Sequence, residues 1–277
     1  MRFGFIIPTG DPRMVGELAH EAELAGWDGA FYWDGIAVGG EVYDPWVVLA
    51  VMGMRTERIR LGLMLTPPAR RRPWKLARET MTIDRLTNGR LVLPVGLGAT
   101  TDPGFANVGE PTDRVTRAEL LDESLDVLTG LWSGTPFRYD GKHYSFEEMA
   151  FQPTPVQMPR IPIWVAAAWY RPKSMRRALR FDGVMPNPLD ERGNHRRETP
   201  EDIAAIQTYV WEHRKATTPF EIVVEGVTPG DDPAATAAII GPRAEAGATW
   251  WIESRWEAPN QPEDLRQRIR QGPPRLG

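Results

Sequence analysis

Residues 59–98 constrain the fold more than any other part of the chain, because they read as strand, helix and strand in succession. Residues 59–65 form a short apolar run, which is typical of a strand covered on both faces. A proline opens the helical repeat of residues 73–87, and an Asn-Gly pair ends it. Residues 90–95 form the second apolar run, and Gly96-Leu97-Gly98 follows directly. The segment is therefore a βαβ unit, whose ligands are expected at the carboxyl ends of its strands.

The same alternation extends through the whole chain. Eight strands separated by helical repeats indicate an α/β protein, a closed (β/α)8 TIM barrel, rather than an open doubly wound sheet. No G-x-G-x-x-G follows any strand, which removes the usual support for the open sheet. The length of 277 residues suits one barrel of ~250 residues, so residues 1–277 are predicted to be a single domain. The strands are predicted to begin near Phe3, Gly29, Ile59, Arg90, Ile163, Gly183, Phe220 and Ala248.

Residues 133–162 interrupt the alternation before the fifth barrel strand. The alternating aromatic residues around Asp140-Gly141 predict a β-hairpin with a type I′ turn. An insert between a helix and the next strand begins on the amino-terminal face, so the hairpin should hang opposite the pocket. Pro94 fits its predicted strand poorly, since proline cannot donate to a strand ladder. We keep the strand because Pro94 lies near its carboxyl end.

The composition describes a globular protein with 42% hydrophobic residues, a net charge of -4 and no cysteine. A mildly acidic chain gives no reason to expect nucleic acid or an anionic membrane as a partner. The absence of cysteine excludes disulfides, thiol nucleophiles and cysteine metal sites. The first residues show no signal peptide, and no apolar stretch is long enough to span a bilayer, so a cytoplasmic location is expected.

The loops after the strands, where a barrel places its site, offer few titratable groups. The acids directly at strand ends are Asp34, Glu225 and Glu253, and no two histidines have metal-ligand spacing. No G-x-S-x-G is present either, which argues against nucleophilic catalysis. A barrel mouth with little acid–base machinery suits a reaction whose chemistry belongs to a cofactor.

Several residues in these loops are candidates for holding such a cofactor, and each has a simpler structural explanation. Gly96 and Gly98 allow a flat ring to approach the backbone, or they only form a tight turn. The basic run of residues 70–72 binds an anion, or is a solvated charge run, which we favour. Arg171, Lys173 and Ser174 begin a helix whose N–H groups suit a phosphate, or they only cap it. Trp33, Trp169 and Trp256 lie near strand ends and are candidates for stacking on a ring.

The order of several short motifs resembles the luciferase-like flavin-dependent oxidoreductases, including their deazaflavin (F420) branch. The motifs include R-R-P at Arg71, L-A-R-E-T at Leu76 and T-I-D-R-L-T-N-G-R at Thr82, followed by the G-L-G of Gly96. The resemblance continues to about Gly183 and implies the same eightfold barrel, with reduced FMN or F420 bound at its carboxyl face. It also implies that Thr66 supports the ring and that Gly96, Leu97 and Gly98 line it. The loop with Ala167, Ala168, Arg171, Lys173 and Ser174 would take the phosphate.

The chain departs from this family in three places. Many relatives have Asp-His or Glu-His after the second strand, where this chain has Asp34-Gly35. F420-dependent sugar-phosphate dehydrogenases have glutamate where this chain has Ala99. Three alanines, 166–168, replace the glycine pair that often opens the phosphate loop. The first two departures argue against a sugar-phosphate dehydrogenase, and they leave Asp34 as the catalytic candidate, with a turn cap as its structural explanation.

Two functions therefore stay open. The first is an FMN- or F420-dependent oxidoreductase, by preference a monooxygenase, acting on a small organic substrate. The second is a barrel that binds a flavin or related ligand without turnover, which the missing histidine motivates. For the first function we also leave open a homodimer and a separate reductase that supplies reduced cofactor.

Overall fold

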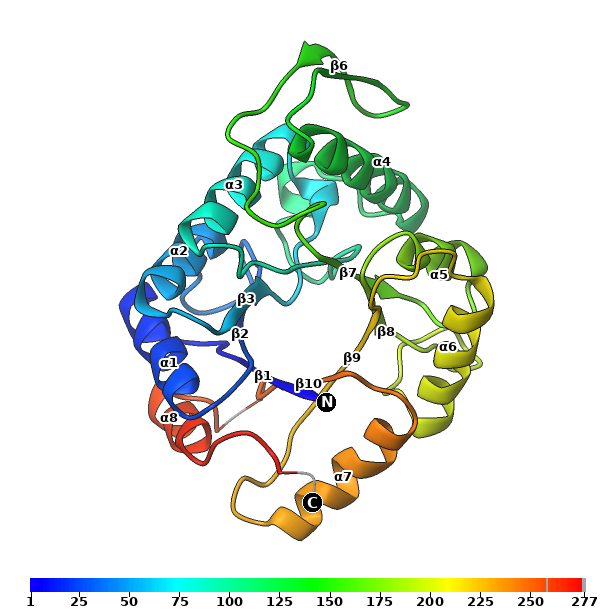
Figure 1. Ribbon diagram of the computed structural model, residues 1–277. Helices are drawn as coiled ribbons and strands as arrows, with labels where there is room; N and C mark the ends of the chain where they lie inside the picture. Colours follow the sequence, from blue (N-terminus) through cyan, green and yellow to red (C-terminus); the bar gives the residue numbers. More distant parts are fainter. Residues whose placement is uncertain (258, 276–277) are drawn as a thin grey trace.

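A computed structural model describes residues 1–257 and 259–275 and contains an eight-stranded parallel sheet closed into a barrel (Figure 1). The sheet order is β3-β2-β1-β10-β9-β8-β7-β4, and two isolated bridges, Leu61–Leu91 and Thr66–Val95, join β4 to β3. The predicted TIM barrel is thus confirmed. The strands are β1 (Arg2–Ile6), β2 (Gly29–Tyr32), β3 (Arg60–Leu63), β4 (Leu93–Val95), β7 (Ile163–Ala167), β8 (Gly183–Pro186), β9 (Glu221–Gly226) and β10 (Trp250–Glu253).

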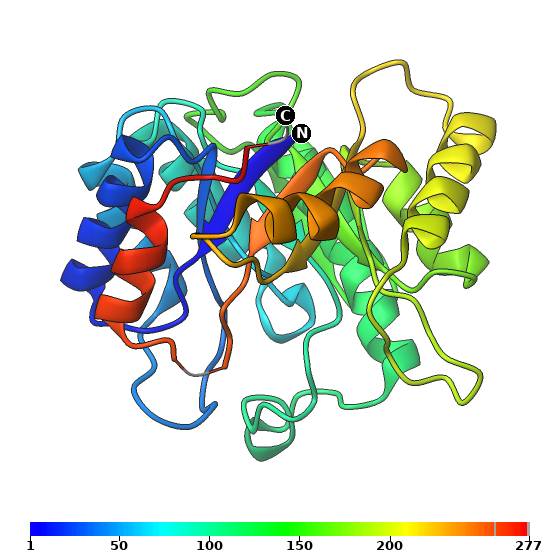
Figure 2. The same ribbon diagram turned by 90° about the horizontal axis from the view of Figure 1, so that it is seen from below.

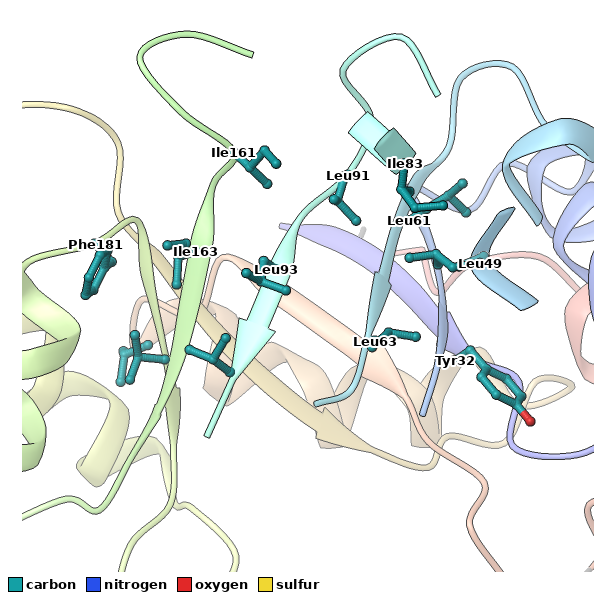
Figure 3. Packing of buried hydrophobic residues seen from close by; sticks show 14 of the residues in the cluster. Tyr32, Leu49, Leu61, Leu63, Ile83, Leu91, Leu93, Ile161, Ile163 and Phe181 are labelled. Carbon is teal, nitrogen blue, oxygen red and sulfur yellow. The ribbon is translucent and has the colours of Figure 1, made fainter. Parts of the chain in front are cut away.

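Helices surround the barrel and cover its outer face (Figure 1). Many of them start at a proline, which lacks only an N–H that the first turn leaves unpaired. The outer face of the strands and the inner face of the helices form the main core, with Leu61, Leu93 and Ile163 among its members (Figure 3). The helices are α1 (Pro12–Leu24), α2 (Pro45–Arg55), α3 (Pro73–Leu86), α4 (Arg114–Trp132), α5 (Pro172–Leu179), α6 (Pro200–His213), α7 (Pro233–Glu245) and α8 (Pro262–Arg270), with short 3-10 turns at Pro68–Arg70 and Ala106–Val108.

Three aromatic rings fill the inside of the barrel. Phe31, Trp164 and Trp250 lie with centroids 5.2 to 6.3 Å apart, and all three are buried. Glycines on neighbouring strands leave the space for these rings, since a Cβ at Gly4 or Gly183 would lie within 3.0 Å of one of them. Side chains therefore fill the interior of the barrel at the level of these rings.

Pro94 lies in β4 at the point where the β3–β4 ladder is interrupted. Thr66 donates its N–H to the carbonyl of Pro94 (2.9 Å), so the Pro94 backbone faces β3. In the described residues β3 ends at Leu63, and two isolated bridges connect it to β4. The missing N–H of Pro94 therefore breaks no continuous β3–β4 hydrogen-bond ladder. The strand prediction is confirmed, and the interruption explains the proline better than its nearness to the strand end.

The insert before β7 forms the predicted hairpin, β5 (Phe137–Asp140) and β6 (Ser145–Met149), but its turn differs from the prediction. Gly141 donates to the carbonyl of Tyr144 (2.8 Å), so Lys142 and His143, not Asp140-Gly141, form the turn. The carboxylate of Glu123 accepts the N–H groups of Lys142, His143 and Tyr144 at 2.8 to 3.1 Å and holds this turn on α4.

The position of the hairpin agrees with the prediction only at its base. The insert begins after Trp132, the carboxyl end of α4, on the amino-terminal face of the barrel. Its turn then lies beside the first half of α4, where Lys142 and His143 contact Glu119. The tip therefore approaches the pocket side, since the acids of α4 bind it there.

Candidate active site

A cavity of about 1730 Å³ opens at the carboxyl ends of the strands. Loops 35–43, 97–113 and 187–198 extend on this side, whereas the two described chain ends lie on the other (Figure 2). The cavity exceeds the roughly 300–1,000 Å³ that is usual for a drug-sized ligand. It therefore has room for a cofactor and a substrate together.

The structure brings most of the predicted site residues together around this cavity. Its lining includes Asp34, Leu97, Gly98, Ala168, Arg171, Lys173 and Ser174. Thr66, Gly96 and Ala167 are absent from the described lining. Thr66 and Ala167 are fully buried, and Ala167 belongs to the core between strands and helices. The backbone of Thr66 connects β3 to β4, so any support it gives a ligand is indirect.

Asp34 lies at the end of β2 with a fully buried carboxylate bound by two arginines. Arg70 Nη2 donates to its Oδ1 at 2.9 Å, and Arg71 Nη2 and Nε donate to its Oδ2 at 2.7 and 3.0 Å. Both carboxylate oxygens already accept charge-assisted hydrogen bonds. The carboxylate of Asp34 therefore positions Arg70 and Arg71 and has little hydrogen-bonding capacity left for a ligand. Its catalytic role stays a prediction.

The basic run of residues 70–72 is neither a free anion site nor a solvated charge run. The side chain of Arg70 is 2% exposed, since it lies between Asp34 and Asp102 and donates to both. Arg71 is half-buried against Asp34, and only Arg72 is exposed. Both sequence interpretations are wrong for Arg70 and Arg71, because two acids distant in sequence neutralise them.

Asp102 was not predicted, and it ties three segments of the mouth together. Its carboxylate accepts from Arg70 and from the N–H groups of Ile36, Ala37 and Gly104, the last at 2.8 Å. Burial would raise the pKa of Asp102, but the Gly104 amide and Arg70 outweigh burial and lower it. The ionised carboxylate thus fixes loop 97–113 to the loop after β2. No periodicity marks such a residue in the sequence.

Gly98 is surrounded by protein, not by open space for a ring. It has a φ of 75°, and a Cβ there would lie 2.8 Å from both Phe105 and Pro67. Arg117 donates to the carbonyls of Leu97 and Gly98 at 2.8 and 2.9 Å and fixes this turn from α4. The tight-turn explanation is therefore the better one for Gly98. A side chain at this position would therefore disturb the turn itself.

Gly96 faces a side chain in the same way. A Cβ at this position would lie 2.8 Å from Leu65 and 3.1 Å from Ala166. Leu65 lines the cavity and therefore lies between Gly96 and the open space. The apolar wall near β3 and β4 consists of side chains, with Met64, Leu65 and Leu97 among them.

The first turn of α5 holds the predicted phosphate-binding residues at the cavity. Arg171 and Lys173 are exposed, and the hydroxyl of Ser174 accepts from the amide of Ala168 at 3.0 Å. The amides of Ser174 and Met175 donate to the carbonyl of Arg171 at 3.0 and 3.1 Å. Fewer N–H groups are thus free than the sequence suggested. Positive charge remains the main attraction for an anion here.

Four of the exposed cations that line this side of the cavity have no acid partner among the described residues, and we call these four the cationic wall. Within residues 1–257 and 259–275 no ion pair involves any of them, whereas the nearby Arg177 is bound to Asp122 at 2.5 Å. Unpaired cations on one wall attract an anionic ligand more strongly than paired ones. The cationic wall consists of Arg114, Arg171, Lys173 and Arg176.

Two of the three tryptophan candidates line the cavity. Trp33 donates to the carbonyl of Pro8 at 2.8 Å, and Trp256 is 41% exposed. Trp169 is buried against Tyr209 and stays outside the described lining. His195, which was not predicted as a site residue, lines the cavity from the loop after β8. Its position after a strand would have been the signal to retain it.

Glu253, one of the three acids at strand ends, is a structural residue. It is fully buried, accepts from Thr228 Oγ1 at 2.7 Å and pairs with Arg255 and Arg268 at 3.3 and 3.5 Å. The described residues contain no cluster of three metal-ligating side chains. No helix among them is long and apolar enough to cross a membrane.

The fold and the site define a parallel barrel with a large carboxyl-face cavity that is cationic on one side. A profile of the family described as luciferase-like monooxygenase matches residues 1–248. The chain therefore belongs to the luciferase-like monooxygenase family, whose members are FMN- or F420-dependent oxidoreductases and monooxygenases.

Two curated relatives show how far the sequence similarity extends. An uncharacterised protein of Mycobacterium tuberculosis is 35% identical over 147 residues, 53% of this chain and 51% of that protein. An F420-dependent glucose-6-phosphate dehydrogenase of Microbacterium testaceum is 29% identical over 177 residues, 61% of this chain and 51% of the enzyme. The matches thus span about half the length of these relatives.

Solved structures with low sequence identity share the fold. The F420-dependent tetrahydromethanopterin reductase of Methanopyrus kandleri has a TM-score of 0.78 and 17% identity, covering 98% of this chain and 96% of that chain. The oxygenating part of a Baeyer-Villiger monooxygenase from Pseudomonas putida, in complex with FMN, has a TM-score of 0.73 and 15% identity. It covers 98% of this chain and 96% of that chain. The neighbours thus bind either F420 or FMN.

Proposed function

We propose that the protein is an oxidoreductase that binds F420 or FMN in the carboxyl-face cavity and acts on a small organic substrate. The cationic wall carries this proposal, because both cofactors have an anionic chain attached to a flat ring. F420 is our first choice, since its chain carries several carboxylates besides the phosphodiester. Four unpaired cations exceed what one phosphate group needs.

The residues present fit such a cofactor. Arg171, Lys173 and Ser174 would hold the phosphate, and the apolar wall of Met64 and Leu65 would contact the ring. When bound, the cofactor would supply the redox chemistry. The protein would hold the substrate beside the ring and restrict water in the mouth.

A sugar phosphate is an unsuitable substrate, although one relative is a glucose-6-phosphate dehydrogenase. The histidine and glutamate expected for that activity are Gly35 and Ala99 here. The mouth also has few charges outside the cationic wall that are not already paired. An uncharged organic molecule therefore suits the remaining space.

A second function, ligand binding without turnover, is favoured by one observation. The carboxylate of Asp34 is fully engaged by Arg70 and Arg71 at 2.7 to 3.0 Å. The acid that stands where relatives have their Asp-His pair is therefore not free to act.

Titration with both cofactors, followed by turnover assays, tests the proposed function. We expect fluorescence titrations to show binding of F420 or FMN, with F420 weakened more by salt because it has more charges. Substitution of Arg176 by Gln should reduce F420 affinity, whereas the exposed Arg192→Gln should not. Absence of binding for both cofactors would reject the proposal. Binding without oxidation or reduction of any compound in a substrate panel would select the second function.

A further inference from the structure

Glu225 points into the barrel. Along β9, Val223 belongs to the interior cluster and Val224 to the outer core, so the next side chain faces inward again. The register agrees, because Glu225 lies opposite Ile252, another member of the interior cluster. Glu225 is one layer nearer the carboxyl end than Val223 and is exposed. Its carboxyl group therefore lies in the mouth of the barrel.

Several other acids around this mouth are paired with arginines. Asp34 and Asp102 pair with Arg70, Asp122 pairs with Arg177, and Glu253 pairs with Arg255 and Arg268. Within residues 1–257 and 259–275 no ion pair involves Glu225, and the side chain of Trp256 hydrogen-bonds to its carboxyl group. Glu225 is thus an acid at a strand end without a cationic partner in the described part of the chain.

The surroundings of Glu225 favour its uncharged form. It is solvent-accessible through the mouth, yet the barrel wall encloses it, and burial raises the pKa of its carboxyl group. The negative charge of Glu198 raises this pKa further, while Trp256 and Arg197 oppose the shift to a smaller extent. The inward neighbours Val223 and Ile252 carry no charge. A protonated carboxyl group can donate a hydrogen bond.

We propose that the carboxyl group of Glu225 binds the carbonyl oxygen of a small ketone or aldehyde in the barrel mouth by donating a hydrogen bond. This inference deepens the proposed function and rests on it for the role of the bound compound as substrate. Glu225 is absent from the described lining of the large cavity, but Trp256, whose side chain hydrogen-bonds to it, belongs to that lining. Below Glu225 the inward side chains of Val223, Ile252 and Met185 are apolar, which suits the hydrocarbon part of such a compound. Removing an uncharged carboxyl group from water to contact the ligand costs less free energy than removing a carboxylate would.

The protonation state can be tested on the free protein. The pKa of Glu225 is raised on folding, so ionisation of the unfolded chain removes stability as pH rises from its ordinary value toward the folded value. Glu225→Gln has no such proton. The variant should therefore gain unfolding free energy over the wild type as pH rises above 4.5, the ordinary value for glutamate, measured by urea denaturation. An equal pH dependence for both proteins would overturn the proposal. Glu191→Gln, an exposed acid in the loop after β8, is the matched control.

Ligand binding tests the second half of the proposal. The dissociation constant of cyclohexanone, measured by NMR titration, should increase as pH rises through the pKa of Glu225 and level off about two- to tenfold higher, because the ionised carboxylate no longer donates. Glu225→Gln, which keeps a donor, should bind cyclohexanone with no pH dependence. Glu225→Leu should bind about two- to tenfold more weakly at low pH. A wild-type affinity that does not vary with pH, or unchanged binding by the leucine variant, would overturn the proposal.

A parallel titration with F420 and FMN separates this inference from the proposed function. Both Glu225 variants should bind the cofactor as the wild type does, since the cationic wall is unchanged. If the wild type binds neither cofactor, the proposed function fails, while the stability and cyclohexanone measurements still decide the role of Glu225.

Discussion

Charged residues in the mouth either hold the structure together or are available to a ligand. Whether a residue has an ion-pair partner distinguishes the two groups. Asp34, Arg70 and Asp102 neutralise one another and fix loops, with Arg70 only 2% exposed. Lys173 and Arg171 have no acid partner among the residues of the described ranges and face the cavity. A residue that is already paired contributes to structure, and an unpaired one at the cavity is available to a ligand.

Lys173→Ala should weaken binding of FMN and F420 by about tenfold and at most a hundredfold. A charge-assisted hydrogen bond is worth roughly 1.5–3 kcal/mol, and the exposure of Lys173 places the loss near the lower end. Fluorescence titration measures the change. Riboflavin, which has the same ring as FMN but no phosphate, is the control and should bind the variant almost as it binds the wild type. Equal losses for riboflavin and FMN would place the phosphate elsewhere.

At the scale of elements, the residues of the family motifs mainly join helices to loops by hydrogen bonds. Asp84 of α3 is fully buried and accepts from Val156 and Gln157 of the insert at 2.7 and 3.1 Å. Arg90 donates to the carbonyls of Gly53 and Thr56 at 3.0 and 2.8 Å. These motifs therefore identify the family by how its helices and loops are joined, not by its chemistry.

The hairpin should depend on Glu123 of α4. Glu123→Ala removes the acceptor of the three turn amides, and we expect a loss of about 1–2 kcal/mol in unfolding free energy. The amides can bind water when the carboxylate is absent, which limits the cost. Urea denaturation measures the loss, and hydrogen exchange should show faster exchange at residues 142–144. Glu148→Ala, at an exposed position of β6, is the control. Equal stability of the two variants would contradict this interpretation.

The barrel itself could be predicted from sequence because strands and helices differ in local pattern. Each strand is an apolar run that helices cover, and the predicted starts agree with the observed ones within about three residues. The position of α5 also follows from the pattern, so Arg171 and Lys173 could be placed at the cavity. Such predictions depend only on residues that lie close together in the sequence.

Contacts between distant segments could not be predicted in this way. The pairing of Arg70 with Asp102 and the packing of Phe105 against Gly98 join loops that carry no periodic signal. The sequence placed Glu225 and Glu253 alike at strand ends. Their different roles depend on which side of the barrel wall each faces, and this depends on the register of the closed sheet.

At the scale of the molecule, the mouth lies above the least continuous part of the barrel. Two isolated bridges join β3 and β4 in the described residues, and we call this junction the seam. The loops beside the seam are held by Asp102, Arg70 and Arg117. A ligand that contacts Met64 and Leu97 would touch both sides of the seam. Binding there should stabilise the folded barrel, because the unfolded chain has no such site.

The bound cofactor should therefore raise the melting temperature measurably. At a ligand concentration one hundred times the dissociation constant, binding adds about 2.7 kcal/mol to the unfolding free energy. For a protein of this size that corresponds to roughly 5–10 °C. Differential scanning fluorimetry with F420, FMN and riboflavin at equal concentration would measure the shifts, with lumazine as a smaller-ring control. Equal shifts for F420 and lumazine at equal concentration would show that the cationic wall adds nothing. No shift with either F420 or FMN would contradict cofactor binding in the mouth.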